Sequence, residues 1–274
     1  PASEVDNFSI VVMEVNEDHS RIVYCWTTNR GRHKEQVKAG VADESDFYSY
    51  CARKIRNLMR VFPCAEIALD AQGGGIAIME ALHDPDKIRE GEVPIWPTIN
   101  DKKEKDTDGE PGLHIVELIQ FAKADWVAEA NHGLRKDFED RTVLFPYFDS
   151  ATLGLAISDD KLKNRLYDTL EDCIMEIEEL KDELSMIIMS QTPSGRDKWD
   201  TPEVKLPGGR KDRLRKDRYS SLIMANWSAR RILRTSPPPV YDTIGGFARG
   251  NKGDMTGPSY VGPSWFTEGM KDVY

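Results

Sequence analysis

Residues 65–82 read Ala-Glu-Ile-Ala-Leu-Asp-Ala-Gln-Gly-Gly-Gly-Ile-Ala-Ile-Met-Glu-Ala-Leu. The apolar run that ends at Asp70 has the length of a buried strand, and apolar side chains recur at helical spacing after Gly75. A strand, a glycine turn and a helix in this order predict an α/β unit. Because sites in open α/β sheets lie where such strands end, the carboxylate of Asp70 is a candidate for chemistry. The alternative is that Asp70 only caps the helix that follows.

Strands and helices are predicted on both sides of this unit. Residues 8–15 and 21–28 are rich in β-formers and are separated by a polar turn, which predicts an antiparallel hairpin. The pattern continues with a basic loop over 30–34 and with a polar segment broken by Pro and Gly over 192–212. Further helices are predicted over 45–62, 125–140, 160–185 and 218–233, and further strands over 113–121 and 186–191. We therefore expect an α/β fold with a mixed sheet flanked by helices over residues 1–234, and a flexible tail rich in Gly and Pro over 235–274.

The charge of the whole chain limits the class of partner. Lys and Arg total 37 and Asp and Glu total 47, so the net charge is −10. This balance argues against binding polyanions by bulk charge, so any contact with nucleic acid needs a local basic patch. The chain has no apolar run of about 18 residues, no signal peptide and no CxxC pair, so we expect a cytosolic protein with reduced thiols and no membrane partner. Because it starts at Pro1 rather than Met, we expect a piece of a longer polypeptide.

One basic patch lies just before the last predicted helix. Six of the nine residues from 210 to 218 are Lys or Arg. Such side chains in a loop suit phosphate contacts, and a second basic stretch follows the predicted hairpin. The candidates for DNA binding are therefore Arg210, Lys211, Arg213, Arg215, Arg30 and Arg32. The alternative for 210–218 is a solvated charge run in which Asp217 caps the last helix.

The glycine run at 73–75 has two interpretations. It either cradles a phosphate at the start of a helix or forms a tight turn with close backbone packing, and we favour the turn. No Gly-Lys-Ser/Thr follows it, and its spacing is not GxGxxG. The run therefore disfavours an ATPase or a dinucleotide-dependent enzyme.

The order of the predicted elements is that of an RNase H-like nuclease. A hairpin, a helix, a strand ending in Asp70, a helix and a late helix starting at Asp217 follow one another. In that architecture carboxylates from separate elements converge on two divalent cations, and hard oxygen ligands suit Mg²⁺ or Mn²⁺. Two such ions, about 3.5–4 Å apart, activate a water and stabilise the leaving oxygen of a phosphodiester. We therefore expect Asp70 and Asp217 to lie close together as metal ligands and catalytic residues.

The chain resembles the nuclease domain of the large terminase subunit of tailed double-stranded DNA bacteriophages. The resemblance rests on residues 1–12 (Pro-Ala-Ser-Glu-Val-Asp-Asn-Phe-Ser-Ile-Val-Val), 67–75, 131–146 (Asn-His-Gly-Leu-Arg-Lys-Asp-Phe-Glu-Asp-Arg-Thr-Val-Leu-Phe-Pro) and 216–222 (Lys-Asp-Arg-Tyr-Ser-Ser-Leu). Residues 67–75 are similar to the strand that carries the family's second acid, and 216–222 to the motif with the third. The first acid of the family directly precedes the stretch that 1–12 resembles, so the resemblance implies that this acid and its strand are missing here. Asp6 is a secondary metal candidate, whose plainer role is to turn the chain into the first strand.

The resemblance implies an endonuclease that cuts concatemeric viral DNA during genome packaging in the host cytoplasm. Its implied partners are double-stranded DNA, a portal protein bound by the tail, a small terminase subunit and an ATPase domain upstream in the same polypeptide. Another RNase H-like nuclease, such as a junction resolvase or a transposase, is the alternative enzyme. The alternative outside enzymes is a non-catalytic module that docks DNA or the portal, which the missing first acid favours for this polypeptide.

Overall fold

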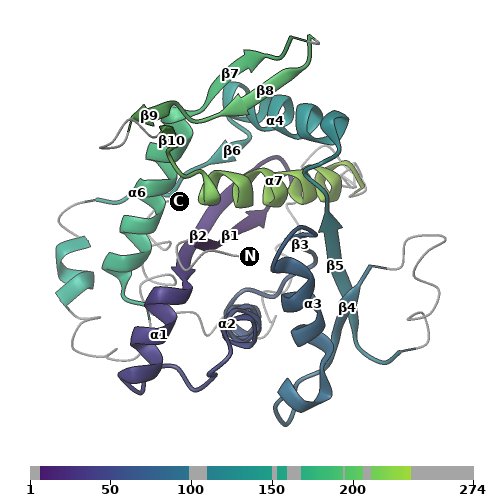
Figure 1. Ribbon diagram of the computed structural model, residues 1–274, viewed down its shortest axis with the longest axis vertical. Helices are drawn as coiled ribbons and strands as arrows, with labels where there is room; N and C mark the ends of the chain where they lie inside the picture. The colour runs from purple at the N-terminus through teal and green to yellow at the C-terminus, as the bar shows by residue number, and fades with distance from the viewer. Residues whose placement is uncertain are drawn as a thin grey trace, which may run out of the picture.

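The computed structural model of this chain describes residues 7–98, 110–149, 153–158, 168–193, 195–205 and 211–235 (Figure 1). Within these ranges the protein is a mixed α/β fold. The strands are β1 (Asn7–Val15), β2 (Ser20–Asn29), β3 (Ile67–Asp70), β4 (Ile95–Pro97), β5 (Leu113–Ile119), β6 (Val143–Leu144), β7 (Ile188–Gln191), β8 (Asp197–Asp200), β9 (Glu203–Lys205) and β10 (Lys211–Arg213). The helices are α1 (Arg30–Lys38), α2 (Phe47–Val61), α3 (Gly75–His83), α4 (Ala124–Glu139), α6 (Leu170–Met186) and α7 (Asp217–Thr235), with a helical turn over 153–158 and a 3₁₀ turn at Pro85–Lys87.

Two three-stranded sheets form the centre of the described fold. The first has the order β1-β2-β6, with β1 antiparallel to β2 and β6 parallel to β2. The second has the order β3-β5-β4 and is parallel throughout. Two small antiparallel pairs, β7–β8 and β9–β10, lie at one end of the molecule, close to α4 and α6 (Figure 1). Parallel strands need a crossover connection, and α3 supplies it between β3 and β4.

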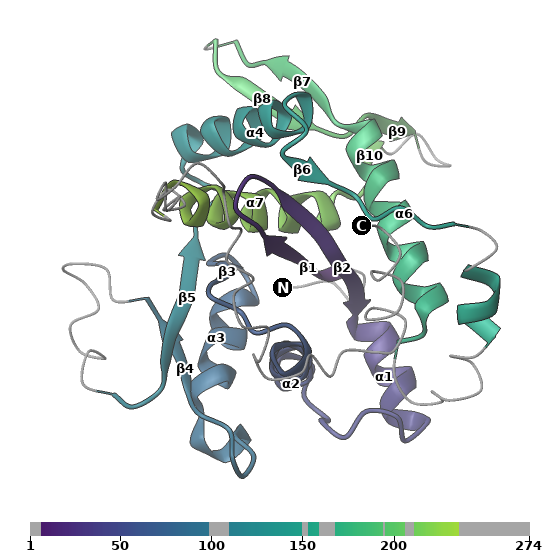
Figure 2. The same cartoon turned by 180° about the vertical axis from the view of Figure 1, so that it is seen from behind.

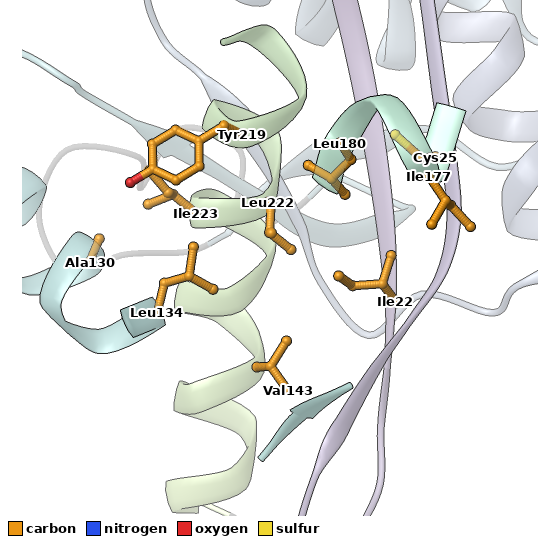
Figure 3. Close-up of a cluster of buried hydrophobic side chains, with 10 residues drawn as sticks. All are labelled: Ile22, Cys25, Ala130, Leu134, Val143, Ile177, Leu180, Tyr219, Leu222 and Ile223. Atoms are coloured by element: carbon orange, nitrogen blue, oxygen red, sulfur yellow. The ribbon is translucent and has the colours of Figure 1, made fainter. Parts of the chain in front are cut away.

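The hydrophobic core is built on both faces of the β1–β2 hairpin. On one face, Val11 and Met13 pack against the cluster that includes Leu222 of α7. Figure 3 shows side chains from β2, α4, β6, α6 and α7 pointing toward one another in this cluster. On the other face, Phe8 and Ile10 pack against the cluster formed with α2. Because both faces of the hairpin are covered by helices, its strands are apolar on both sides, as buried strands are.

Most of the predicted elements are confirmed. The hairpin, the helix at α2, the strand–turn–helix unit at β3 and α3, the strands at β5 and β7, and the helices at α4 and α7 all form. The predicted loop at 30–34 is wrong, because this segment is the start of α1. The side chain of Asn29 caps that helix by accepting a hydrogen bond from the Arg32 N–H at 2.9 Å.

Two other expectations were incomplete. The segment 192–212, predicted without strands, contains β8, β9 and part of β10, each only three or four residues long. Strands this short leave almost no periodic pattern to recognise. The predicted helix over 160–185 begins at Leu170 among the described residues, and residues 160–167 lie outside them. Of the tail predicted over 235–274, Thr235 is the last residue of α7 and the rest lies outside the described residues. Among the helices that the structure describes, none is long and apolar enough to span a bilayer.

Candidate functional site

A cavity of about 1160 Å³ lies between the two three-stranded sheets. Its walls are β1 and β3, together with side chains of α2 and α7 and the glycine turn after β3. Asp70 and Asp217 both line this cavity, and the secondary structure places one at the end of a strand and the other at the start of a helix. The structure thus brings both predicted acids to the same cavity from distant parts of the chain.

Asp70 is held by the turn that follows it. It is the last residue of β3, and its Oδ1 accepts a hydrogen bond from the Gln72 N–H at 2.9 Å. The side chain is half-buried, and this burial raises the pKa of Asp70 above its usual range, although the Gln72 N–H acts in the opposite direction. A charged Asp70 is therefore costly in this position unless a cation lies beside it.

The glycine run brings α3 directly onto the end of β3. A Cβ placed on Gly75 would lie 1.7 Å from the carbonyl oxygen of Asp70, and one on Gly74 would lie 2.6 Å from the ring of Tyr48. Gly73 has a φ of +63°, a conformation that favours glycine. These contacts support the close-packed turn, which is the interpretation that the sequence favoured.

Asp217 is held by elements far away in the sequence. It is the first residue of α7, and the Ser220 N–H donates to the Lys216 carbonyl at 2.9 Å, so Lys216 occupies the cap position. Asp217 is therefore the first helical residue, one position after the cap. The Ser221 hydroxyl donates to the Ser9 carbonyl at 2.9 Å, which fixes the first turn of α7 on β1. The guanidinium of Arg215 lies 3.8 Å from Asp217 Oδ2.

The C-terminal part of α7 is fixed beside β3 and β5 by ion pairs. In this part of α7, Arg231 forms ion pairs with Glu66 at 2.6 Å and with Glu117 at 2.7 Å. Glu66 directly precedes β3, so the C-terminal part of α7 lies at the start of that strand.

Glu183 of α6 contacts the first turn of α7, and no sequence pattern singled this residue out. It is buried in α6, accepts the Tyr219 N–H at 2.9 Å and pairs with Arg218 Nη1 at 2.9 Å. Its burial raises the pKa of Glu183, and the hydrogen bonds from Tyr219 and Arg218 oppose that rise. In a helix this rich in Glu and Asp, one buried acid has no distinguishing sequence signal. The partner, Arg218, also pairs with Glu176 at 2.8 Å, so this member of the basic segment points inward.

Much of the predicted basic patch is neutralised by acids on neighbouring elements. Residues 211–213 form β10 rather than a loop, because they pair with β9. Arg213 pairs with Asp200 and, at 3.2 Å, with Glu203. Lys216 lies 3.1 Å from Asp200 and donates to the Trp199 carbonyl. Arg215 is exposed and lies beside Asp217. Arg210 and the side chain of Lys211 lie outside the described residues.

In the second basic stretch, the Arg30 side chain is held by neighbouring rings, whereas the Arg32 side chain is exposed. The guanidinium of Arg30 lies 5.1 Å from the centre of the Tyr48 ring and 5.6 Å from the centre of the Phe47 ring. It also donates a hydrogen bond to the Tyr48 hydroxyl at 2.8 Å. Because Tyr48 lines the cavity and contacts the glycine turn, Arg30 is held beside its rim. Arg32 is 61% exposed and donates to the Thr27 carbonyl.

The described residues gather at most two metal-ligating side chains of the His, Cys, Asp or Glu type at any one place. They include no group of three or more His, Cys, Asp or Glu side chains arranged to hold a metal ion. Asp6, the secondary candidate, lies outside the described residues. Comparisons of this chain with family models, with curated proteins and with solved structures find no match.

Proposed function

We propose that the protein is a divalent-metal-dependent DNA endonuclease of the RNase H-like class, with Asp70 and Asp217 as metal ligands and catalytic residues. The observation that carries this proposal is that these two acids, from opposite halves of the chain, line one cavity. A further observation supports it: Asp70 is half-buried beside the glycine turn, and this burial disfavours its charged form.

The donor set fits Mg²⁺ or Mn²⁺. Carboxylate oxygens are the hard ligands that these ions prefer, and Mg²⁺ is commonly bound by one or two carboxylates, with waters and substrate phosphates as its other ligands. A bound cation would stabilise the charged form of Asp70, which its burial disfavours. When bound, the cations supply an activated water and charge stabilisation for phosphodiester hydrolysis. In this proposal the chain's own residues present the two carboxylates to one cavity and fix the start of α7 through Ser221 and Glu183.

The basic side chains best placed for DNA are those beside the acids. Arg215 is exposed next to Asp217, and Arg30 is held at the cavity rim by Tyr48. Arg213 is a weaker candidate because two carboxylates already compensate its charge. The resemblance to terminase nuclease domains extends the proposal to cleavage of concatemeric viral DNA, with the portal, the small subunit and an upstream ATPase domain as partners.

The test is metal binding followed by cleavage. Titration calorimetry on the 274-residue protein should show weak Mg²⁺ binding and tighter Mn²⁺ binding. Asp70→Asn and Asp217→Asn should each lower the Mn²⁺ affinity by about ten-fold or more. Asp182→Asn, an exposed acid on α6, is the matched control and should leave binding unchanged. With Mn²⁺ present, the native protein and Asp182→Asn should nick supercoiled plasmid, and Asp70→Asn and Asp217→Asn should nick it far more slowly. Mn²⁺ affinity that is equal in all four proteins would contradict the proposal.

A second candidate function, a non-catalytic module that docks DNA, is favoured by one observation. The described residues offer no third acid, His or Cys to complete a metal-binding group with Asp70 and Asp217. Such a module would bind DNA equally well with and without Mn²⁺ and would not nick plasmid. The nuclease instead requires that DNA binding and Mn²⁺ binding reinforce each other, since both act at the same acids.

A further inference from the structure

Arg30 is a partly buried arginine that pairs with no carboxylate among the described residues. Its neighbours there are the rings of Phe47 and Tyr48 and the Tyr48 hydroxyl, which accepts its hydrogen bond. Its Nε–H is buried and has no hydrogen-bond partner in the described part of the chain. The other described arginines that are at least partly buried each pair with a carboxylate, and they are Arg21, Arg53, Arg56, Arg218, Arg230 and Arg231. Arg30 is therefore a cation that still needs an anion.

The Arg30 guanidinium is fixed by contacts within the protein. Phe47 and Tyr48 lie in the first turn of α2, where the carboxylate of Asp46 caps the helix by accepting the Ser49 N–H at 2.8 Å. The centres of the Phe47 and Tyr48 rings are 5.8 Å apart, so the two rings also pack on each other. A planar guanidinium held beside two rings keeps its N–H groups in one orientation. This arrangement suits a two-point contact with a phosphate.

Tyr48 connects Arg30 to the turn that follows Asp70. A Cβ placed on Gly74 would lie 2.6 Å from the Tyr48 ring and 3.4 Å from its hydroxyl oxygen. The same oxygen accepts the hydrogen bond from Arg30. In both views of the molecule α2 lies between α1, which begins at Arg30, and α3, which begins at Gly75 (Figures 1 and 2). The guanidinium of Arg30 is therefore separated from the glycine turn by a single side chain.

We infer that Arg30 binds a backbone phosphate of duplex DNA beside the phosphodiester on which Asp70 and Asp217 act, and that Tyr48 is the positioning residue for this contact. The inference rests on the proposed function. A phosphate supplies the negative charge that Arg30 lacks, whereas Asp70 favours a cation beside it. The two neighbouring sites therefore suit one polyanionic strand with its bound metal ions. Because phosphate contacts fix the position of DNA without reading its bases, this contact is independent of sequence.

The test measures duplex binding by fluorescence anisotropy in EDTA, where neither metal nor cleavage contributes. Arg30→Ala should lower the affinity by about five-fold and the salt slope by about one unit. Tyr48→Phe keeps the ring and removes only the hydroxyl, and it should lower the affinity by about three-fold. In an Arg30→Ala background Tyr48→Phe should have no further effect, because it acts through Arg30. Lys38→Ala removes an exposed charge from the same helix and is the matched control, with unchanged affinity expected.

Each part of the inference can be overturned separately. Equal affinities of Arg30→Ala and Lys38→Ala, or a native protein that binds no duplex, would overturn the phosphate contact. An equal loss from Tyr48→Phe with and without Arg30 would overturn the positioning role, because the hydroxyl would then act through another group. Urea denaturation checks that each variant folds. If Arg30→Ala does not fold, Arg30→Gln, which keeps most of the side chain, takes its place in the comparison.

Two further arms separate this inference from its alternatives. Inorganic phosphate titrated into the native protein by calorimetry should bind weakly, and tight binding that Arg30→Ala removes would assign the site to a free phosphate and overturn the DNA contact. Because the anisotropy measurements use no metal, a protein that neither binds Mn²⁺ nor nicks plasmid would contradict the nuclease proposal without touching the Arg30 contact. An inert Arg30 in a protein that binds Mn²⁺ and nicks plasmid would do the reverse.

Discussion

Asp70 and Asp217 line the same cavity but are positioned by opposite means. Asp70 is held by its neighbours in sequence, namely the Gln72 N–H and the glycine run that brings α3 against the strand end. Asp217 is held by contacts from β1 and α6, through Ser9 and Glu183. The first acid therefore belongs to a local motif, whereas the position of the second depends on packing between distant elements. A change in a remote helix should thus disturb Asp217 while leaving Asp70 in place.

The largest expected effect comes from removing the remote support. Glu183→Ala leaves Arg218 with a buried charge that has lost one partner and leaves the Tyr219 N–H without its acceptor. Loss of one partner from a buried ion pair costs about 3 kcal/mol or more of unfolding free energy, measured by urea denaturation. Glu179→Ala is the matched control, since Glu179 pairs with the same arginine but is exposed, and it should cost less than about 1 kcal/mol. Equal losses in the two variants would show that Glu183 gives no special support to α7.

A somewhat smaller effect is expected from the local motif. Gly75→Ala places a methyl group against the Asp70 carbonyl, so either α3 or the end of β3 must shift. Overpacking of this kind costs about 1–3 kcal/mol of unfolding free energy. Gly154→Ala is the control, because a methyl group there meets open space within a helical turn, and it should be neutral or slightly stabilising. A tolerated Gly75→Ala would mean that the turn does not position Asp70.

The pH dependence of stability should separate Asp70 from acids that stabilise the fold. Burial raises the pKa of Asp70 in the folded state, so its ionisation disfavours folding at neutral pH. Asp70→Asn should therefore increase unfolding free energy at pH 7 by up to about 1 kcal/mol. The gain should shrink as the pH falls through the raised pKa and vanish below the ordinary pKa of about 3.8, where the carboxyl is neutral in both states. A variant less stable than the native protein at pH 7 would contradict this account.

The smallest effects concern the arginines on either side of Asp217. Arg215→Ala should weaken duplex binding a few-fold and lower the salt slope by about one unit, because this exposed arginine, whose contact with Asp217 is as long as 3.8 Å, can turn to neutralise a phosphate. Arg213→Ala should change both quantities less, because Asp200 and Glu203 already compensate its charge. Fluorescence anisotropy over a series of salt concentrations measures both. The reverse order would mean that the DNA path follows β10 rather than the start of α7.

The sequence-based predictions succeeded where the deciding interactions lie within a few positions of the chain and failed where they join distant elements. The hairpin, α2, the unit around Asp70 and α7 were predicted because hydrophobic periodicity and turn residues act within a few positions. The loop expected at 30–34 is a helix because the Asn29 cap outweighs a run of basic residues. The free basic patch at 210–218 was overestimated, since its acidic partners, Asp200 and Glu183 among them, lie on other elements. Charge pairing of this kind leaves no signal in the local pattern.

The amino-acid sequence was sufficient to place Asp70 at the end of a strand and Asp217 at the start of a helix, because secondary structure depends on short-range spacing. Their meeting in one cavity depends on the direction of α7 across β1 and β3, which is set by Ser221 at one end and Arg231 at the other. The parallel pairing of β3 with β5 is likewise a property of the assembled sheet. It joins residues far apart in the chain, so no local pattern specifies which strands become neighbours.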